Sequence, residues 1–142
     1  MHRRLTRALR GAVVWGLALA ACGEASDPDA GRLVGRWRVD VTALRGETGF
    51  VHLEDEARAV VEQVEAAATY EFRADGEAVR SLGAEQTAVR WWLPGRTETG
   101  ALRLRTRDTV GVEREVLVRF VGDAMHFINA DVPWTLHLVP AR

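Results

Sequence analysis

Residues 33–42, LVGRWRVDVT, decide the fold class because their side chains alternate between two chemical types. The apolar set is Leu33, Gly35, Trp37, Val39 and Val41, and the charged residues between them are Arg36, Arg38 and Asp40. A period of two residues is that of a β-strand with one buried and one solvated face. We therefore expect a half-buried strand over residues 33–42.

The same period returns along the rest of the chain. Short alternating segments are separated by turn residues such as Asp75-Gly76, Pro94-Gly95 and Gly122-Asp123, and Asp-Gly is a favoured hairpin turn. The further expected strands are 70–73, 77–82, 87–93, 102–106, 113–121, 125–128 and 134–139. About eight short strands at regular spacing indicate a mostly β fold, an antiparallel sandwich or barrel.

One segment departs from this period. Residues 50–68 place apolar side chains at helical spacing, opposite a face of acids and arginine. Such a pattern predicts an amphipathic helix with one face toward the core. We expect it between the first and second strands.

In order and in motif, the chain resembles the lipocalin-like domains of bacterial secreted and lipid-anchored proteins. Residues 33–37, LVGRW, are similar to the G-x-W that opens the first lipocalin strand. Residues 70–76, YEFRADG, are similar to the "F-x-x-D-G" hairpin of that family, and residues 118–125 precede a last apolar strand. The resemblance implies a small barrel of about eight strands in which Trp37 plugs the closed end.

The first residues have the form of a secretory signal. Arg3, Arg4, Arg7 and Arg10 precede an apolar run over residues 11–21, about half of the ~20 residues that a permanent membrane helix needs. Residues 19–22, LAAC, resemble the lipobox of bacterial lipoproteins. That resemblance implies cleavage before Cys22, a diacylglyceryl group on its sulfur and an acyl group, such as palmitate, on its new amino terminus. The alternative is an ordinary secreted protein with an incidental Cys22.

The expected organisation is a removed signal over residues 1–21, a flexible tether over 22–31 and one barrel domain over 32–142. Residues 22–31, CGEASDPDAG, are small, acidic and turn-prone. The resemblance to bacterial lipoproteins implies that Gly23, directly after the cysteine, favours the outer membrane, on its periplasmic face, over the inner membrane. Cys22 is the only cysteine, so the domain is expected to depend on its hydrophobic core and not on disulfides.

Charge and residue types exclude several classes of function. The full chain has a net charge of −1, and the signal removes four arginines and no acid, so nucleic acid is not an expected partner. His52, His126 and His137 have no metal-ligand spacing, although the last two can approach across neighbouring strands. By its alternation with Leu136 and Leu138, His137 is expected to face solvent. We expect no metal, no cofactor and no catalytic group.

The aromatic residues are the candidates for a ligand pocket or barrel floor. An eight-stranded barrel has an interior that is either filled by side chains or holds one small ligand. Of the adjacent Trp91 and Trp92, one must point outward. The candidate residues are Trp37, Phe72, Trp91, Trp92 and Trp134.

Two functions are compatible with the sequence. The first is a non-catalytic, lipid-anchored protein of the cell envelope that binds a small apolar ligand or a partner. The second is an envelope interaction, accessory or inhibitor lipoprotein with a solid core and no ligand. In both, Cys22 attaches the protein to the membrane.

Overall fold

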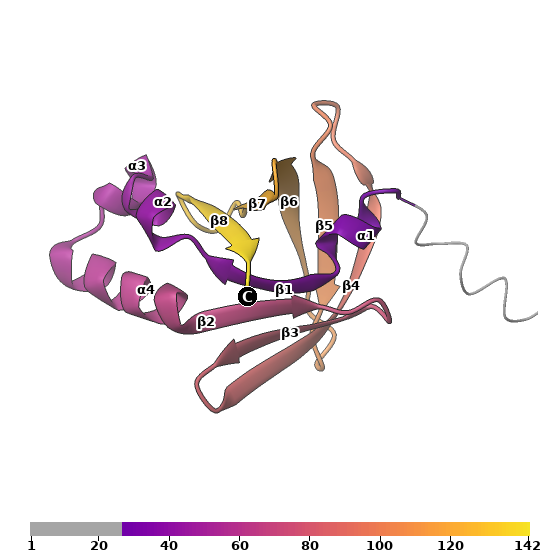
Figure 1. Cartoon of the computed structure of the whole chain (residues 1–142), viewed down its shortest axis with the longest axis horizontal. Helices are drawn as coiled ribbons and strands as arrows, with labels where there is room; N and C mark the ends of the chain where they lie inside the picture. Colours follow the sequence, from indigo (N-terminus) through magenta and orange to yellow (C-terminus); the bar gives the residue numbers. More distant parts are fainter. Residues whose placement is uncertain (1–26) are drawn as a thin grey trace, which may run out of the picture.

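Eight antiparallel strands close into a barrel in which each strand pairs with the next and β8 pairs with β1 (Figure 1). The structure is a computed structural model that describes residues 27–142. The strands are β1 (Gly35–Val39), β2 (Ala68–Phe72), β3 (Glu77–Leu82), β4 (Glu85–Arg96), β5 (Leu102–Arg107), β6 (Glu113–Val121), β7 (Ala124–Ile128) and β8 (Thr135–Pro140). The predicted mostly β class and the antiparallel barrel of about eight strands are confirmed, and this barrel is consistent with a small lipocalin-like one.

Apolar side chains at alternate positions of the strands point inward and pack in the barrel. Trp37 and Val39 of β1 are buried, whereas Arg36 before them and Arg38 between them are exposed. The largest fully buried side chains are Phe50, Leu33, Leu44, Leu102, Leu104, Met125, Leu138 and Val118. Two of the expected turns are present, and Gly76 and Gly122 in them adopt φ angles of 86° and 62°, in the region that favours glycine. Pro94-Gly95, expected to end a strand, instead lies within β4, where the register with β5 shifts between Trp92 and Gly95.

The first strand is shorter than the sequence predicts. The alternating stretch 33–42 contains only β1, and it is flanked by the short helices α1 (Ala30–Leu33) and α2 (Val41–Arg45). Asp40 starts α2, because its side chain accepts a hydrogen bond from the Ala43 backbone N–H at 3.1 Å. The prediction of a strand over all of 33–42 is therefore wrong at both ends.

The predicted helix between β1 and β2 is present but divided. Residues 50–68 contribute to α3 (Thr48–Val51) and α4 (Asp55–Ala67). Glu54 has an extended backbone, with ψ at 145°, so the helix restarts at Asp55. Within residues 27–142, none of the helices combines the length and the apolar character needed to span a membrane.

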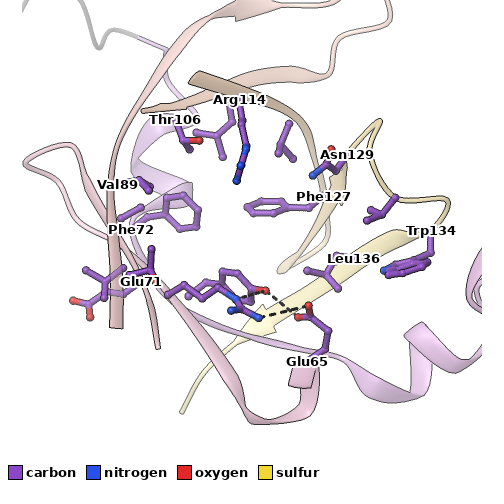
Figure 2. Close-up of a pocket in the computed structure, with 18 residues that line it drawn as sticks. Glu65, Glu71, Phe72, Val89, Thr106, Arg114, Phe127, Asn129, Trp134 and Leu136 are labelled. Atoms are coloured by element: carbon purple, nitrogen blue, oxygen red, sulfur yellow. Dashed lines mark hydrogen bonds and ion pairs between the residues drawn. The ribbon is translucent and has the colours of Figure 1, made fainter. Parts of the chain in front are cut away.

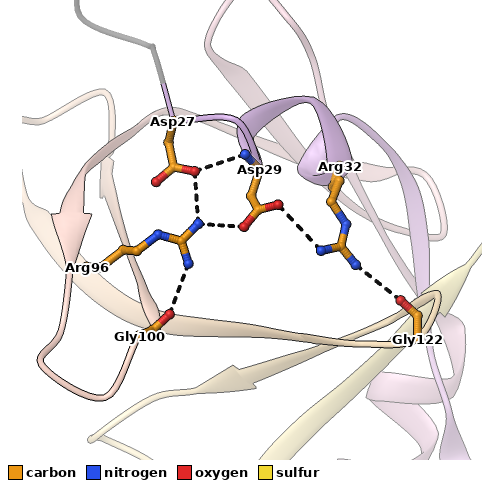
Figure 3. A network of polar contacts seen from close by, with 6 residues as sticks. All are labelled: Asp27, Asp29, Arg32, Arg96, Gly100 and Gly122. Atoms are coloured by element: carbon orange, nitrogen blue, oxygen red, sulfur yellow. Dashed lines mark hydrogen bonds and ion pairs between the residues drawn. The ribbon is translucent and has the colours of Figure 1, made fainter.

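The first described residues form a polar network with loops and strands at one end of the barrel (Figure 3). One guanidinium nitrogen of Arg96 in β4 lies 3.0 Å from a carboxylate oxygen of Asp27 and 2.5 Å from one of Asp29. Arg32 of α1 donates a hydrogen bond to the Gly122 carbonyl at 3.2 Å. Residues 27–31, expected in the flexible tether, are thus bound to the barrel through the carboxylates of Asp27 and Asp29.

Trp37 connects residues 27–33, which we call the N-terminal cap, to the strands. Its indole Nε1 donates a hydrogen bond to the Leu33 carbonyl at 2.9 Å, and the side chain is only 6% exposed. The last residue of α1 and the middle residue of β1 are therefore joined inside the core.

Trp37→Phe should destabilise the fold by roughly 1–3 kcal/mol, because it removes the indole hydrogen bond and leaves a small cavity. Urea unfolding followed by circular dichroism measures the change. Trp92→Phe is the matched control, because Trp92 contacts a surface arginine. Equal losses in the two variants would contradict the role assigned to Trp37.

Candidate ligand-binding pocket

A pocket of about 440 Å³ lies inside the barrel, at the end opposite α1. Its lining residues come from the end of α4, from strands β2 to β8 and from the loop between β7 and β8. Among them are Tyr70 at the start of β2, Arg80 near the end of β3 and Thr87 near the start of β4. The described chain enters the barrel at one end, and the pocket occupies the other.

The pocket has an apolar wall (Figure 2). Phe72 and Phe127 face each other edge to face, with ring centroids 5.9 Å apart. The other apolar side chains of the wall are Ala78, Val79, Val89, Leu104, Val116, Val132, Trp134 and Leu136. This volume and lining fall within the range of small-molecule pockets, which are mostly apolar clefts of ~300–1,000 Å³.

A polar cluster of three side chains lies on one side of the pocket. The Tyr70 hydroxyl donates a hydrogen bond to Glu65 Oε2 at 2.9 Å and accepts one from Arg80 Nε at 3.3 Å. An Arg80 guanidinium nitrogen also lies 3.9 Å from Glu65 Oε1. Burial, followed by the negative charge of Glu65, raises the pKa of Tyr70 to about 12, so Tyr70 is a neutral hydroxyl at physiological pH.

Arg114 extends into the pocket from β6 (Figure 2). It pairs in register with Thr106 of β5, another lining residue. Within residues 27–142, no carboxylate lies within ion-pair distance of its guanidinium group. Arg114 is an exposed residue, so its charge stays in contact with solvent at the opening.

The structure separates the five aromatic candidates. Phe72 and Trp134 line the pocket, whereas Trp37, Trp91 and Trp92 do not. Trp37 is in the core beside α1, and Trp91 packs on Phe72 with its Nε1 3.2 Å from the Arg73 and Glu77 carbonyls. Trp92 is the outward member of its pair.

Trp92 lies beside a surface arginine on the outside of the barrel. The centre of its ring is 5.5 Å from the guanidinium carbon of Arg107, a cation–π distance.

Cys22, the expected lipidation site, lies outside the described residues.

Helix α3 holds the wall of the pocket at Trp134. Phe50 packs edge to face on Trp134, with ring centroids 6.1 Å apart. Gly49 lies so close to the loop before β8 that an added Cβ would be 1.9 Å from the Pro133 carbonyl oxygen. Only glycine allows this approach, so α3 fixes the position of Trp134.

Outside the barrel, Glu47, His126 and His137 form a second cluster. His137 was expected to face solvent, but it is half-buried, with Nε2 2.5 Å from Glu47 Oε1. The rings of His126 and His137 lie 4.1 Å apart, as the cross-strand prediction allows. The side chain of Glu47, which precedes α3, contacts His137, and alternation alone does not reveal this contact. Among residues 27–142, no group of three or more His, Cys, Asp or Glu side chains is arranged to hold a metal ion.

Both ends of this cluster have shifted pKa values. The hydrogen bond from His137 holds the pKa of Glu47 below its usual value. Burial, followed by the charge of His137, lowers the pKa of His126. His126 therefore stays neutral in the folded protein at pH values where the unfolded chain binds a proton.

Folding stability should decrease as the pH falls below about 6.5, the ordinary pKa of histidine, because only unfolded His126 then gains a proton. A further loss is expected below about 4.5, where Glu47 is protonated more readily in the unfolded chain. Urea midpoints from pH 8 to pH 5 measure the first step. His126→Gln should reduce that step, and the exposed His52→Gln should not. An identical loss in His126→Gln would contradict the assignment.

The arrangement of the pocket is suited to binding. Its polar groups are hydrogen-bond donors, hydroxyls and the carboxylates of Glu65 and Glu71, and no histidine among residues 27–142 lines it. The sequence analysis considered aromatic residues as lining and overlooked Arg80 and Arg114. Alternation could have revealed both, because Arg80 shares a face with Ala78, and Arg114 with Val116 and Val118.

Comparison of the chain with models of known families, with curated proteins and with solved structures finds no significant match.

Proposed function

We propose that this protein is a non-catalytic binding protein of the cell envelope that holds a small apolar ligand inside its barrel. The observation that carries the proposal is the pocket of about 440 Å³ lined by phenylalanine, leucine and tryptophan. Burying apolar ligand surface against such a wall is favourable by roughly 25 cal/mol per Å² of area removed from water. The polar groups at the opening orient the ligand and keep the site wettable when it is empty.

The alternative function, an interaction or inhibitor lipoprotein with a solid core, requires a filled barrel. The strand ends near α1 are filled, with Leu33, Met125 and Leu138 at 0% exposure. The opposite end is hollow. This difference between the two ends favours a ligand over a solid-core partner function.

We further propose that Cys22 is lipidated and anchors the protein to the outer membrane on its periplasmic face. The support is the signal-like residues 1–21 and the LAAC motif. The position of Asp27 is compatible with this, because it is bound to Arg96 at the α1 end of the barrel. An anchor attached there leaves the opening of the pocket on the far side from the attachment.

Thr87→Trp should weaken the binding of the neutral dye Nile red about tenfold or more, because a large side chain then occupies the opening of the pocket. The increase in dye fluorescence on binding is the measurement. The matched control is Ala88→Trp, because the next residue of a strand faces the outside. If the two variants bind the dye equally well, or if the unmodified protein does not bind it, the pocket is not the site.

Cys22→Ser should abolish lipidation and leave the precursor uncleaved, because the modified sulfur is what the lipoprotein pathway requires. Mass spectrometry of the intact protein and fractionation of the membranes measure the outcome. Ser26→Ala, four residues further on, controls for substitution in the same segment. Unchanged mass and unchanged membrane association in Cys22→Ser would end the proposal of an anchor.

A further inference from the structure

The pocket contains one positive charge that the protein does not neutralise. Four charged residues line it, namely Glu65, Glu71, Arg80 and Arg114. The Glu71 carboxylate is directed away from the cavity (Figure 2) and forms an ion pair with Arg73 at 3.1 Å. Glu65 is engaged by Arg80 and by the Tyr70 hydroxyl. Arg114, on the opposite wall, has no carboxylate partner within residues 27–142. The interior therefore carries one positive charge more than it carries negative charges.

The outer face of the same two strands is arranged differently. Arg103 and Arg105 of β5 both bind Glu115 of β6, at 3.0 and 2.9 Å. Arg107 forms an ion pair with Glu113. Each outward arginine of β5 thus has an acid across the strand pair. The inward Arg114 stands opposite Thr106, whose side chain is uncharged and cannot form an ion pair with it.

The surroundings of Arg114 indicate which kind of ligand would pair with its guanidinium group. Its guanidinium group is above an apolar wall that includes Val116 and Phe127. A guanidinium binds a carboxylate through charge-assisted, bidentate hydrogen bonds. Asn129 adds a donor at the same opening, because its side-chain oxygen already accepts from the Asp131 backbone N–H at 2.9 Å.

We propose that the pocket takes a monoanionic amphiphile, an apolar body with a single carboxylate head, and that Arg114 binds the head at the opening. This rests on the proposed ligand-binding function and names the class of its ligand. The apolar body lies against Phe72, Phe127 and Leu136. A second negative charge on the ligand would meet Glu65 across the pocket, which is why the head carries only one.

The test compares three probes of equal chain length, dodecanoate, dodecanol and dodecyltrimethylammonium, each displacing Nile red from the purified protein at neutral pH. Dodecanoate should bind about tenfold or more tightly than dodecanol, since hydrogen bonds to a charged group contribute more than neutral ones. The cation should bind most weakly. Raising the salt concentration should reduce the advantage of dodecanoate only partly, because the contact is at the wall of a pocket.

Three variants assign the effect to Arg114. Arg114→Gln should remove the preference for dodecanoate and leave the affinity for dodecanol within about twofold, because the apolar wall is unchanged. Arg114→Lys should recover part of the preference. Arg36→Gln removes the same charge from an exposed position of β1 and should change nothing. Circular dichroism verifies that each variant is folded.

The outcomes separate this inference from the proposed function. If dodecanol and dodecanoate bind equally well, the anionic head is wrong and the apolar pocket stands. A preference that persists in Arg114→Gln places the head elsewhere and also overturns the inference. If the protein binds neither probe nor dye, both the inference and the proposed function fail.

Discussion

The pairing of β1 with both β2 and β8 is the constraint on which the rest of the structure depends. β1 has only five residues, yet Trp37 stands opposite Tyr70 on one side and Pro140 on the other. Without these two ladders the sheet would have two open edges, whose unpaired backbone groups are costly and prone to aggregation. Trp37 extends the closure to the N-terminal cap through its hydrogen bond to Leu33. Trp37 therefore contributes both to closing the sheet and to sealing one end of the barrel.

Sealing one end determines where a ligand can go. Inward positions near α1 carry large apolar side chains, such as Leu102, Val118 and Met125, which pack without leaving space. Near the other end, inward positions of β5 and β6 carry Thr106 and Arg114, and β4 carries Thr87. Such side chains keep their polar groups in contact with water, because burying them without partners would cost several kcal/mol each, about 2–7. They therefore line an opening and do not fill it, and the pocket is a consequence of this gradient along the barrel.

Much of this was accessible from the sequence, and the exceptions have physical causes. Period and turn residues predicted the strands and the barrel, because each turn is encoded locally. The ends of β1 were missed, since alternation in 33–42 continues into residues that Asp40 caps as a helix. That either Trp91 or Trp92 faces outward follows from adjacency. Which one does so depends on the register with β5, where Trp91 stands opposite Thr106. Register across strands is a tertiary property that a single strand does not encode.

The same register decides the charge inside the barrel. Along β6, acids alternate with inward residues, so that Glu113 and Glu115 meet the arginines of β5 on the outside while Arg114 faces inward. A slip of one residue would reverse every side chain of the strand, placing both acids in the pocket and Arg114 in solvent. It would also expose Val116 and Val118, which the hydrophobic core does not allow. The packing of apolar residues near the closed end therefore fixes the sign of the charge at the open end. A preference for an anionic ligand would then follow from the strand register of the barrel, and no additional helix, strand or loop would be needed to produce it.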